Sequence, residues 1–162
     1  MAILEKLRVF LDENHAEYTH TVHPLAFTAR EVASAEHLPP RDIAKTVVVF
    51  GDGGYHMMVV PANRLVDFQE VRLSLGLTHA RMATEEELGR LFPDCELGAM
   101  PAVGGLYGMR VYLDNSLASE DMIAFYGGTH RDEVHMRTAD YRKLVDPTVI
   151  TLARQAASRH GW

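Results

Sequence analysis

The run of residues 43–50, Ile-Ala-Lys-Thr-Val-Val-Val-Phe, constrains the fold more than any other part of the chain. It is apolar or β-branched apart from Lys45, and a glycine-rich turn follows it. A half-exposed strand would alternate apolar and polar residues, so this run predicts a strand covered on both faces. Side chains alternate across a strand, which puts Lys45 on the same face as Val47 and Val49. The lysine therefore occupies a position where an apolar side chain is expected.

Lys45 has two interpretations at this stage. Lysines at strand ends commonly lay their aliphatic stem along the protein and release the ammonium group into water. Alternatively, Lys45 lies at the mouth of a pocket, where it meets a phosphate or a developing oxyanion as a point charge. The strand alone does not decide between them.

The size and composition of the chain indicate a single globular domain over residues 1–162. Its 162 residues are 47% hydrophobic and 23% charged, which is ordinary for a folded protein. No apolar run approaches the roughly 20 residues of a membrane helix, and the N-terminus does not resemble a signal peptide. We expect a cytoplasmic protein that does not associate with membranes.

The charge and the cysteine content exclude several functions. A formal net charge of −6 disfavours a non-specific nucleic-acid binder, which would show a basic surface, although a local basic rim is still allowed. The single cysteine, Cys95, can form neither an intrachain disulfide nor a thiolate-based zinc site. Its acidic neighbours Asp94 and Glu96 should raise the pKa of the thiol, so we do not expect a nucleophile there.

Hydrophobic spacing and capping patterns predict an α+β domain with a curved, barrel-like mixed sheet flanked by helices. The two strands nearest the glycine turn should form a hairpin at the centre of the sheet. Capping boxes are expected at Thr28, Asp67 and Thr84, a cap at Thr138, and a left-handed helix end at Asn14. Helices are predicted over residues 3–14, 28–38, 67–76, 84–92, 138–145 and 148–158, and strands over residues 18–22, 43–50, 55–60, 109–113, 122–126 and 133–136.

Residues 94–108 contain four glycines and a proline and form the best candidate for a shaped binding loop. The glycines follow neither the dinucleotide-binding order nor the P-loop order, so those two functions are weakly supported. A long connection without a ligand is the alternative, but long loops in compact domains are more often functional.

Metal and serine-nucleophile chemistry have little support in the sequence. Nine histidines are present, but no H-E-x-x-H or Cys/His pattern occurs, so no metal site is predicted. His130 and His135 near the Gly127-Gly128 turn stay open as pocket residues, although surface histidines are the commoner case. No G-x-S-x-G motif marks a nucleophilic serine.

Four pieces of the chain, in order, resemble the YbaK/ProX aminoacyl-tRNA editing domain, which is also found inserted in bacterial prolyl-tRNA synthetases. They are a T-x-x-E-x-A helix in residues 28–38, the K-T strand at Lys45 and Thr46, a Gly-Pro loop at residues 98–104, and a V-Y-L-D…G-G…A-D-Y stretch in residues 111–141. Each piece is weak alone. Their order and spacing carry the resemblance over nearly the whole chain.

The resemblance implies a free-standing hydrolase that cleaves the ester between a wrong amino acid and the terminal adenosine of tRNA. In such enzymes the strand lysine, here Lys45, lies beside the aminoacyl-adenosine, and no metal or organic cofactor is expected. Glu133 aligns with an acidic position at the family's pocket. The substrate-binding residues expected from the resemblance are Gly98, Ala99, Met100, Pro101, Thr46, His130 and Glu133.

The chain departs from the family's G-x-x-x-P pattern, because Leu97 stands where the first glycine is expected. This bears on the shape of the pocket and on its amino-acid preference. A non-catalytic module that binds an aminoacyl nucleotide or a partner protein is therefore the alternative function.

An editing site is useful because a synthetase pocket discriminates one methylene by only about 1–3 kcal/mol. The aminoacyl ester is already activated, so positioning and charge stabilisation can suffice without a covalent nucleophile. The expected partner is mischarged aminoacyl-tRNA. An acidic protein would reach it through a basic rim of Arg41, Arg131 and Arg137, or through delivery by a synthetase or an elongation factor.

Overall fold

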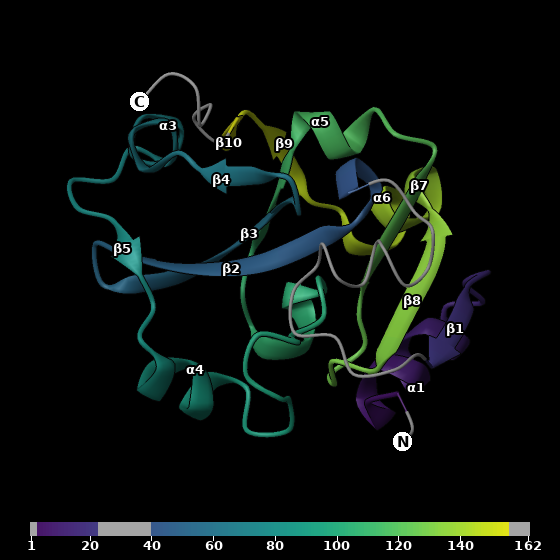
Figure 1. The fold of residues 1–162 in the computed structure, drawn as a ribbon. Helices are drawn as coiled ribbons and strands as arrows, with labels where there is room; N and C mark the ends of the chain where they lie inside the picture. Colours follow the sequence, from purple (N-terminus) through teal and green to yellow (C-terminus); the bar gives the residue numbers. More distant parts are fainter. Residues whose placement is uncertain (1–2, 23–39, 156–162) are drawn as a thin grey trace.

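The computed structural model describes residues 3–22 and 40–155, and its elements are shown in Figure 1. The helices are α1 (Glu5–Glu13), α3 (Phe68–Leu75), α4 (Glu85–Leu91), α5 (Asn115–Ala118) and α6 (Thr138–Val145), with 3-10 turns η1 (Pro40–Asp42) and η2 (Gly104–Tyr107). The strands are β1 (Thr19–Val22), β2 (Ala44–Gly51), β3 (Gly54–Pro61), β4 (Arg64–Val66), β5 (Arg81–Met82), β6 (Val111–Asp114), β7 (Met122–Tyr126), β8 (Asp132–Arg137), β9 (Thr148–Ile150) and β10 (Ala153–Gln155).

The strands form three sheets with helices around them. The largest has the order β5-β2-β3-β6-β9, in which β2 is antiparallel to β3 and β5, whereas β3, β6 and β9 are parallel. Strands β1, β8 and β7 form an antiparallel sheet on the right of Figure 1, and β10 pairs with β4. The predicted α+β architecture with a mixed sheet is confirmed, although these described strands do not close into a barrel.

The predicted hairpin of β2 and β3 is the centre of the large sheet. Its turn places Asp52 (φ 50°) and Gly53 (φ 86°) in the left-handed region, as tight hairpin turns of the primed types require. The Asp52 carboxylate accepts hydrogen bonds from the backbone N–H groups of Thr78 (2.8 Å) and His79 (3.0 Å). These bonds lower the pKa of Asp52 and tie the turn to the segment after α3.

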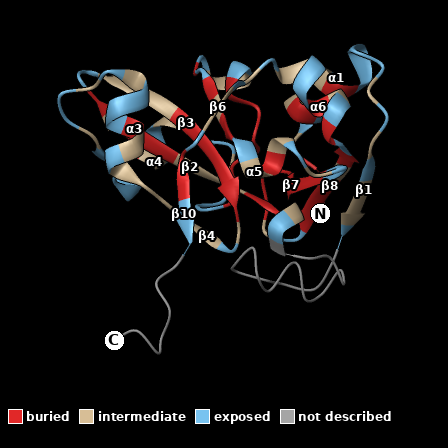
Figure 2. Cartoon of the chain, turned by 90° about the horizontal axis from the view of Figure 1, so that it is seen from above, coloured by how far each residue is buried: buried red, intermediate tan, exposed pale blue. Residues whose placement is uncertain are grey.

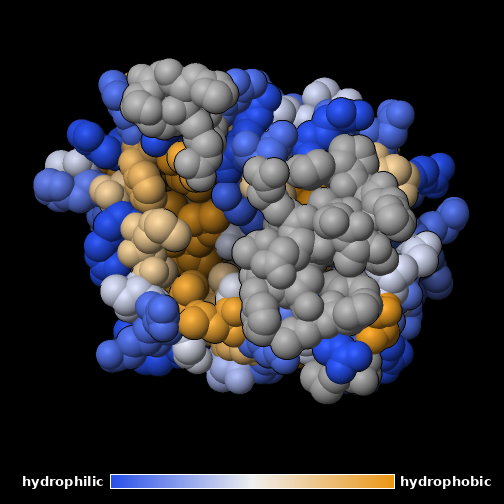
Figure 3. All heavy atoms as spheres, viewed as in Figure 1, coloured by the Kyte–Doolittle hydropathy of each residue, from blue (hydrophilic) through white to orange (hydrophobic). Residues whose placement is uncertain are grey.

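Both faces of β2 are covered, as the sequence predicts. Val48 belongs to the main core with side chains from α1, β3 and β6, whereas Val49 belongs to a second cluster with Val71 of α3. Figure 2 shows the two central strands largely buried. Part of the second cluster reaches the surface, since Val47 and Phe68 are only partly buried and an apolar area lies over β2 in Figure 3.

One short contact joins the large sheet to the β1-β8-β7 sheet. Ile43, just before β2, forms a parallel bridge with Ala124 of β7. Both residues are buried, and Ala62 packs against them. The start of β2 is therefore held against the middle of β7.

The predicted helix over residues 148–158 is wrong within the described part of the chain. Residues 148–150 form β9 beside β6, and residues 153–155 form β10 beside β4. The Asp114 carboxylate accepts hydrogen bonds from the N–H groups of Leu152 (2.8 Å) and Ala153 (2.9 Å) and fixes the bend between the two strands. The β-branched run at residues 148–151 was the signal for a strand.

Two predicted helix ends also differ, and one predicted helix lies outside the described residues. Thr138 is the first residue of α6, with Arg137 as the N-cap, and its buried hydroxyl oxygen has no hydrogen-bond partner. After α1, the left-handed residue is His15 (φ 54°), whereas Asn14 stays at φ −94°. Residues 28–38 are not described.

No helix in residues 3–22 and 40–155 has the length and apolar character to span a membrane.

Glu87 holds α4 to the hairpin through the predicted capping box and two further contacts. Thr84 Oγ1 accepts the Glu87 N–H (3.1 Å), and Glu87 Oε1 accepts the Thr84 N–H (2.8 Å). Glu87 also accepts hydrogen bonds from the Arg81 guanidinium (2.8 and 3.0 Å) and from the Tyr55 hydroxyl (2.5 Å). Together, led by the Arg81 bond, these contacts hold the pKa of Glu87 well below its ordinary value of 4.5.

We expect Glu87→Gln to lower the melting temperature at pH 7, because the amide cannot accept all of these charge-assisted bonds. A folded-state pKa below the unfolded-state value stabilises the protein above the unfolded-state pKa, and this stabilisation is lost as the pH falls through the folded-state pKa. The difference between wild type and variant should therefore shrink below pH 4.5. Thermal unfolding between pH 7 and pH 3 measures it.

Glu86→Gln is the matched control, because Glu86 is exposed and pairs only with Arg90 at 3.7 Å. A pH-independent difference for Glu87→Gln, or an equal effect of the control, would contradict the assignment.

Candidate active site

The candidate site occupies one face of the β1-β8-β7 sheet and the start of β2. Tyr126 of β7 pairs with Glu133 of β8, which in turn pairs with Thr21 of β1. Residues paired across a ladder project to the same face. Two residues after the Ile43–Ala124 bridge come Lys45 on β2 and Tyr126 on β7. Alternation therefore places Lys45 on the face of Tyr126 and Glu133.

Lys45 is partly buried on this face. Among the residues that the structure describes, none forms a hydrogen bond or an ion pair with its ammonium group. Burial lowers the pKa of Lys45 from its ordinary value. A half-buried cation without an acidic partner is unfavourable for stability, so the arrangement favours the second interpretation of Lys45, a cation positioned to meet a ligand.

The loop of residues 98–101 packs against the same face. Ala99, Met100 and Pro101 are buried, and Ala99 contacts Tyr126. The backbone connects the loop to the β7–β8 turn, since the Gly128 N–H donates to the Ala99 carbonyl at 3.1 Å. The predicted binding loop therefore lies beside Tyr126, on the side of the sheet that carries Lys45.

His130 lies over the loop. Its backbone N–H donates to Glu96 Oε1 (2.8 Å), and its Nδ1 lies 3.0 Å from the same oxygen. The ring makes an edge contact with Tyr126, with ring centroids 5.4 Å apart. Gly98 has φ +86°, and a Cβ placed there would lie 3.3 Å from His130 Nε2. The sequence left His130 open as a pocket residue, and the structure places it against Gly98.

Glu133 is fully buried at the centre of the face. His135 Nε2 lies 2.7 Å from its Oε1, an ion-pair distance, but the contact lacks hydrogen-bond geometry, and neither carboxylate oxygen has a hydrogen bond. Thr21 Oγ1 lies 3.4 Å from the same imidazole nitrogen. The structure thus brings Glu133 and His135 together on the face of Lys45.

Thr46 does not join this group. Successive side chains of β2 project to opposite sides, so Thr46 faces away from Lys45, and its buried hydroxyl has no hydrogen-bond partner. The predicted contact of Thr46 with the substrate therefore has no support from its orientation. Thr46 can affect substrate binding only indirectly, through the position of β2.

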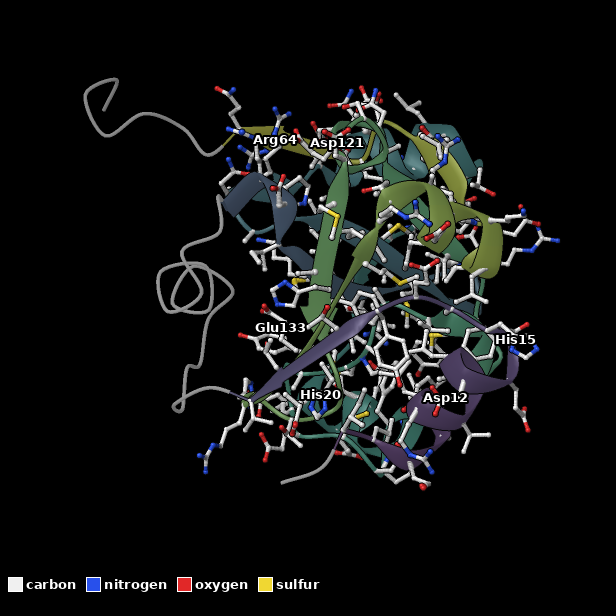
Figure 4. The ribbon with its side chains drawn as sticks, turned by 90° about the vertical axis from the view of Figure 1, so that its right-hand side faces the viewer. Asp12, His15, His20, Arg64, Asp121 and Glu133 are labelled. Atoms are coloured by element: carbon white, nitrogen blue, oxygen red, sulfur yellow. The ribbon has the colours of Figure 1, made fainter. Side chains whose placement is uncertain are left out.

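A network on the opposite face of β8 was missed by the sequence reasoning. His20 Nε2 lies 2.6 Å from Asp132 Oδ1, and the Thr129 hydroxyl donates to Asp132 Oδ2 at 2.5 Å. Thr129 Oγ1 also accepts the N–H groups of Arg131 and Asp132. This Ser/Thr-type turn holds the start of β8. Figure 4 labels His20 on β1 and Glu133 on the neighbouring strand β8, and the pairing of His20 with Val134 places these two side chains on opposite faces of the sheet. The sequence signal for this turn was Thr129 itself, which precedes Arg131 by two residues and Asp132 by three.

Cys95 is not activated. Burial raises the pKa of its thiol to about 11, with a further increase from Asp94. The predicted direction is confirmed, although burial rather than acidic neighbours is the main cause. In residues 3–22 and 40–155, no group of three or more His, Cys, Asp or Glu residues is arranged to hold a metal ion.

Comparison with known proteins decides the family. Residues 23–144 match the model of the aminoacyl-tRNA editing domain. The chain belongs to the aminoacyl-tRNA editing domain family. The resemblance drawn from the four sequence pieces is thereby confirmed, and the β2 strand, the 98–101 loop and β8 all lie inside the matched region of this editing domain.

The curated relatives of the editing domain are longer proteins. This chain is 29% identical over 154 residues to a proline–tRNA ligase of Staphylococcus epidermidis, and the match covers 91% of this chain and 26% of the relative. It is 34% identical over 77 residues to the proline–tRNA ligase of Thermosipho melanesiensis, covering 48% of this chain and 13% of the relative. The chain thus spans about a quarter or less of these relatives.

Solved structures show the same fold. A crystal structure assigned as a candidate trans-editing enzyme for prolyl-tRNA synthetase matches with a TM-score of 0.83 and 24% identity, covering 93% of this chain and 96% of that one. A scaffold protein used to present linear epitopes matches with a TM-score of 0.83 and 21% identity over 93% and 97% of the two chains.

Gly98→Ala tests the contact between the loop and His130. The left-handed φ costs a non-glycine residue about 1–2 kcal/mol, and the new methyl group would press on the imidazole. We expect a lower melting temperature and a shifted His130 imidazole resonance in NMR spectra. Gly105→Ala is the control, since nothing lies within 4 Å of a Cβ there and its φ is not positive. An unshifted His130 resonance in Gly98→Ala would contradict the contact.

Proposed function

We propose that this editing domain hydrolyses the ester bond between an amino acid and the terminal adenosine of mischarged tRNA. The observation that carries the proposal is the half-buried Lys45, without an acidic partner among the described residues, on the face that the 98–101 loop, His130 and Glu133 share. Membership of the editing family supports the reaction class. Because the curated relatives are proline–tRNA ligases, mischarged proline tRNAs are the first substrates to test.

Lys45 supplies positive charge where the substrate is negative. The ammonium orients a phosphate of the terminal nucleotide, or stabilises the oxyanion that forms when the ester carbonyl is attacked. Its partial burial strengthens either interaction, because fewer water molecules screen the charge. The 98–101 loop holds the amino acid through main-chain groups, and His130 lies against Gly98 and Tyr126 beside it.

Water is the proposed nucleophile. It adds to the ester carbonyl, the bond to the ribose oxygen breaks, and the products are the free amino acid and tRNA with its terminal hydroxyl restored. Cys95 is unsuited to the attack because its thiol is protonated at neutral pH. The ester is activated enough for positioning and charge stabilisation to carry the reaction, so the proposal requires no metal or organic cofactor.

Of the two predicted routes by which tRNA reaches the site, a basic rim and delivery by a partner, the positions of the arginines favour the second. Arg41 lies 3.4 Å from Glu120, and Arg137 pairs with Asp140 (2.9 Å) and Glu17 (3.8 Å). Arg131 and Arg137 flank opposite ends of β8, which spans roughly 20 Å at about 3.3 Å per residue. These arginines do not form one rim, so we favour delivery by a partner such as a synthetase or an elongation factor.

Two variants of Lys45 test the proposal. Lys45→Ala removes the ammonium and should reduce deacylation of mischarged tRNA at least about 100-fold, as for other groups that stabilise developing charge. Lys45→Met keeps the volume and removes the buried charge, so it should raise the free energy of unfolding while abolishing hydrolysis. Single-turnover release of the labelled amino acid and chemical denaturation measure the two effects.

Lys143→Ala is the control, because Lys143 is exposed and belongs to α6, which carries none of the candidate-site residues. Full activity of a folded Lys45→Met protein would refute the role of Lys45. If a panel of mischarged tRNAs is left intact but aminoacyl-adenosine analogues still bind, the domain is the non-catalytic binding module.

A further inference from the structure

Glu133 is the most deeply buried charged residue on the candidate face. The residue is fully buried, yet neither carboxylate oxygen accepts a hydrogen bond from the residues that the structure describes. Burying a carboxylate is strongly unfavourable unless it is paired and hydrogen-bonded. His135 forms an ion-pair contact with Oε1 that lacks hydrogen-bond geometry, and no described residue forms a hydrogen bond or ion pair with Oε2. The fold therefore retains an acceptor that the described residues do not use.

The position of Glu133 relative to Lys45 points to the missing donor. β7 lies between the start of β2 and β8, so the backbones that carry the two residues are about 10 Å apart at about 4.8 Å per strand spacing. Both long side chains lie on one face with Tyr126 between them. A ligand lying across Tyr126 therefore meets a cation at one end and a carboxylate at the other.

An aminoacyl ester has the complementary charges. Its nucleotide end carries phosphates and its carbonyl develops negative charge, whereas the α-amino group next to that carbonyl is a cation with three N–H donors. We propose that Glu133 accepts hydrogen bonds from the α-ammonium group of the bound aminoacyl ester and makes the site specific for esters with a free α-amine. This inference rests on the proposed function and specifies the α-ammonium group as the part of the substrate that Glu133 recognises.

The proposal predicts which esters the site rejects. Replacing the α-ammonium group by a hydroxyl, as in an α-hydroxyacyl-tRNA, leaves the charge of Glu133 unmatched, and an N-acetyl group removes the positive charge and adds bulk. A site with a buried charged acceptor rejects a ligand that lacks the matching donor, because the acceptor is then left unpaired. Esters with a blocked or missing amine should therefore be poor substrates.

The experiment compares two tRNA substrates that carry the same side chain, one aminoacylated and one converted to the α-hydroxyacyl ester. The wild-type protein should hydrolyse the aminoacyl ester with a kcat/KM about 10- to 100-fold higher, after correction for the spontaneous rates. Glu133→Gln should lose most of this preference, mainly through slower hydrolysis of the aminoacyl ester. Glu86→Gln, exposed on α4, is the matched control.

A purely structural role would lower hydrolysis of both esters equally and keep their ratio, and that result would overturn the proposal. If Glu133→Gln does not fold, the wild-type ratio still decides: equal hydrolysis of both esters would overturn it. If the wild type hydrolyses neither ester, the proposed function fails. Isothermal calorimetry with amide-linked aminoacyl-adenosine and its α-hydroxyacyl counterpart then tests the role of Glu133 separately. We expect the aminoacyl analogue to bind more tightly, and equal affinity for the two analogues would contradict the proposal.

Discussion

The bridge between Ile43 and Ala124 connects two sheets that otherwise have separate hydrogen-bond ladders. Because side chains alternate along both strands, this one contact determines which residues of β2 and β7 face the same way. It places Lys45 on the same face as Tyr126, and the β7–β8 ladder adds Glu133 to that face. A shift of β2 by one residue would turn Lys45 away and bring Thr46 to the face instead. The chemistry of the site therefore depends on the register of one short bridge between buried apolar residues.

The face assembled in this way carries a cation without an acidic partner and a buried carboxylate whose only contact of ion-pair length among the described residues is with His135. Lys45 is half-buried without an acidic partner among the described residues, and Glu133 is fully buried without a hydrogen bond. Two other buried acids are hydrogen-bonded: Glu87 accepts hydrogen bonds from Arg81, Tyr55 and Thr84, and Asp132 accepts one from Thr129. An unpaired cation and a buried carboxylate without hydrogen bonds on one face are expected where a ligand completes the interactions.

Much of this arrangement follows from local sequence signals. The β-branched run predicted β2 and its burial on both faces, the glycine turn predicted the hairpin, and Thr84 with Glu87 predicted the start of α4. The C-terminal strands β9 and β10 were missed because they depend on partners distant in sequence, namely β6, β4 and the Asp114 carboxylate. For the site, Lys45 and the glycine-rich loop were candidates from the sequence itself, whereas their roles in binding the substrate, and the choice of Glu133, came from the family resemblance. Their common face could not be predicted, because it requires the Ile43–Ala124 bridge, and no local pattern signals the His20–Asp132 contact.

A crystal structure of the protein with a non-hydrolysable, amide-linked aminoacyl-adenosine 5′-phosphate tests the central claim most directly. The account predicts that the analogue lies across Tyr126, with its phosphate or carbonyl oxygen within hydrogen-bond distance of Lys45 Nζ, its amino acid against the 98–101 loop and its α-ammonium group on Glu133. An analogue bound on another face, or bound here with Lys45 turned into solvent, would contradict it.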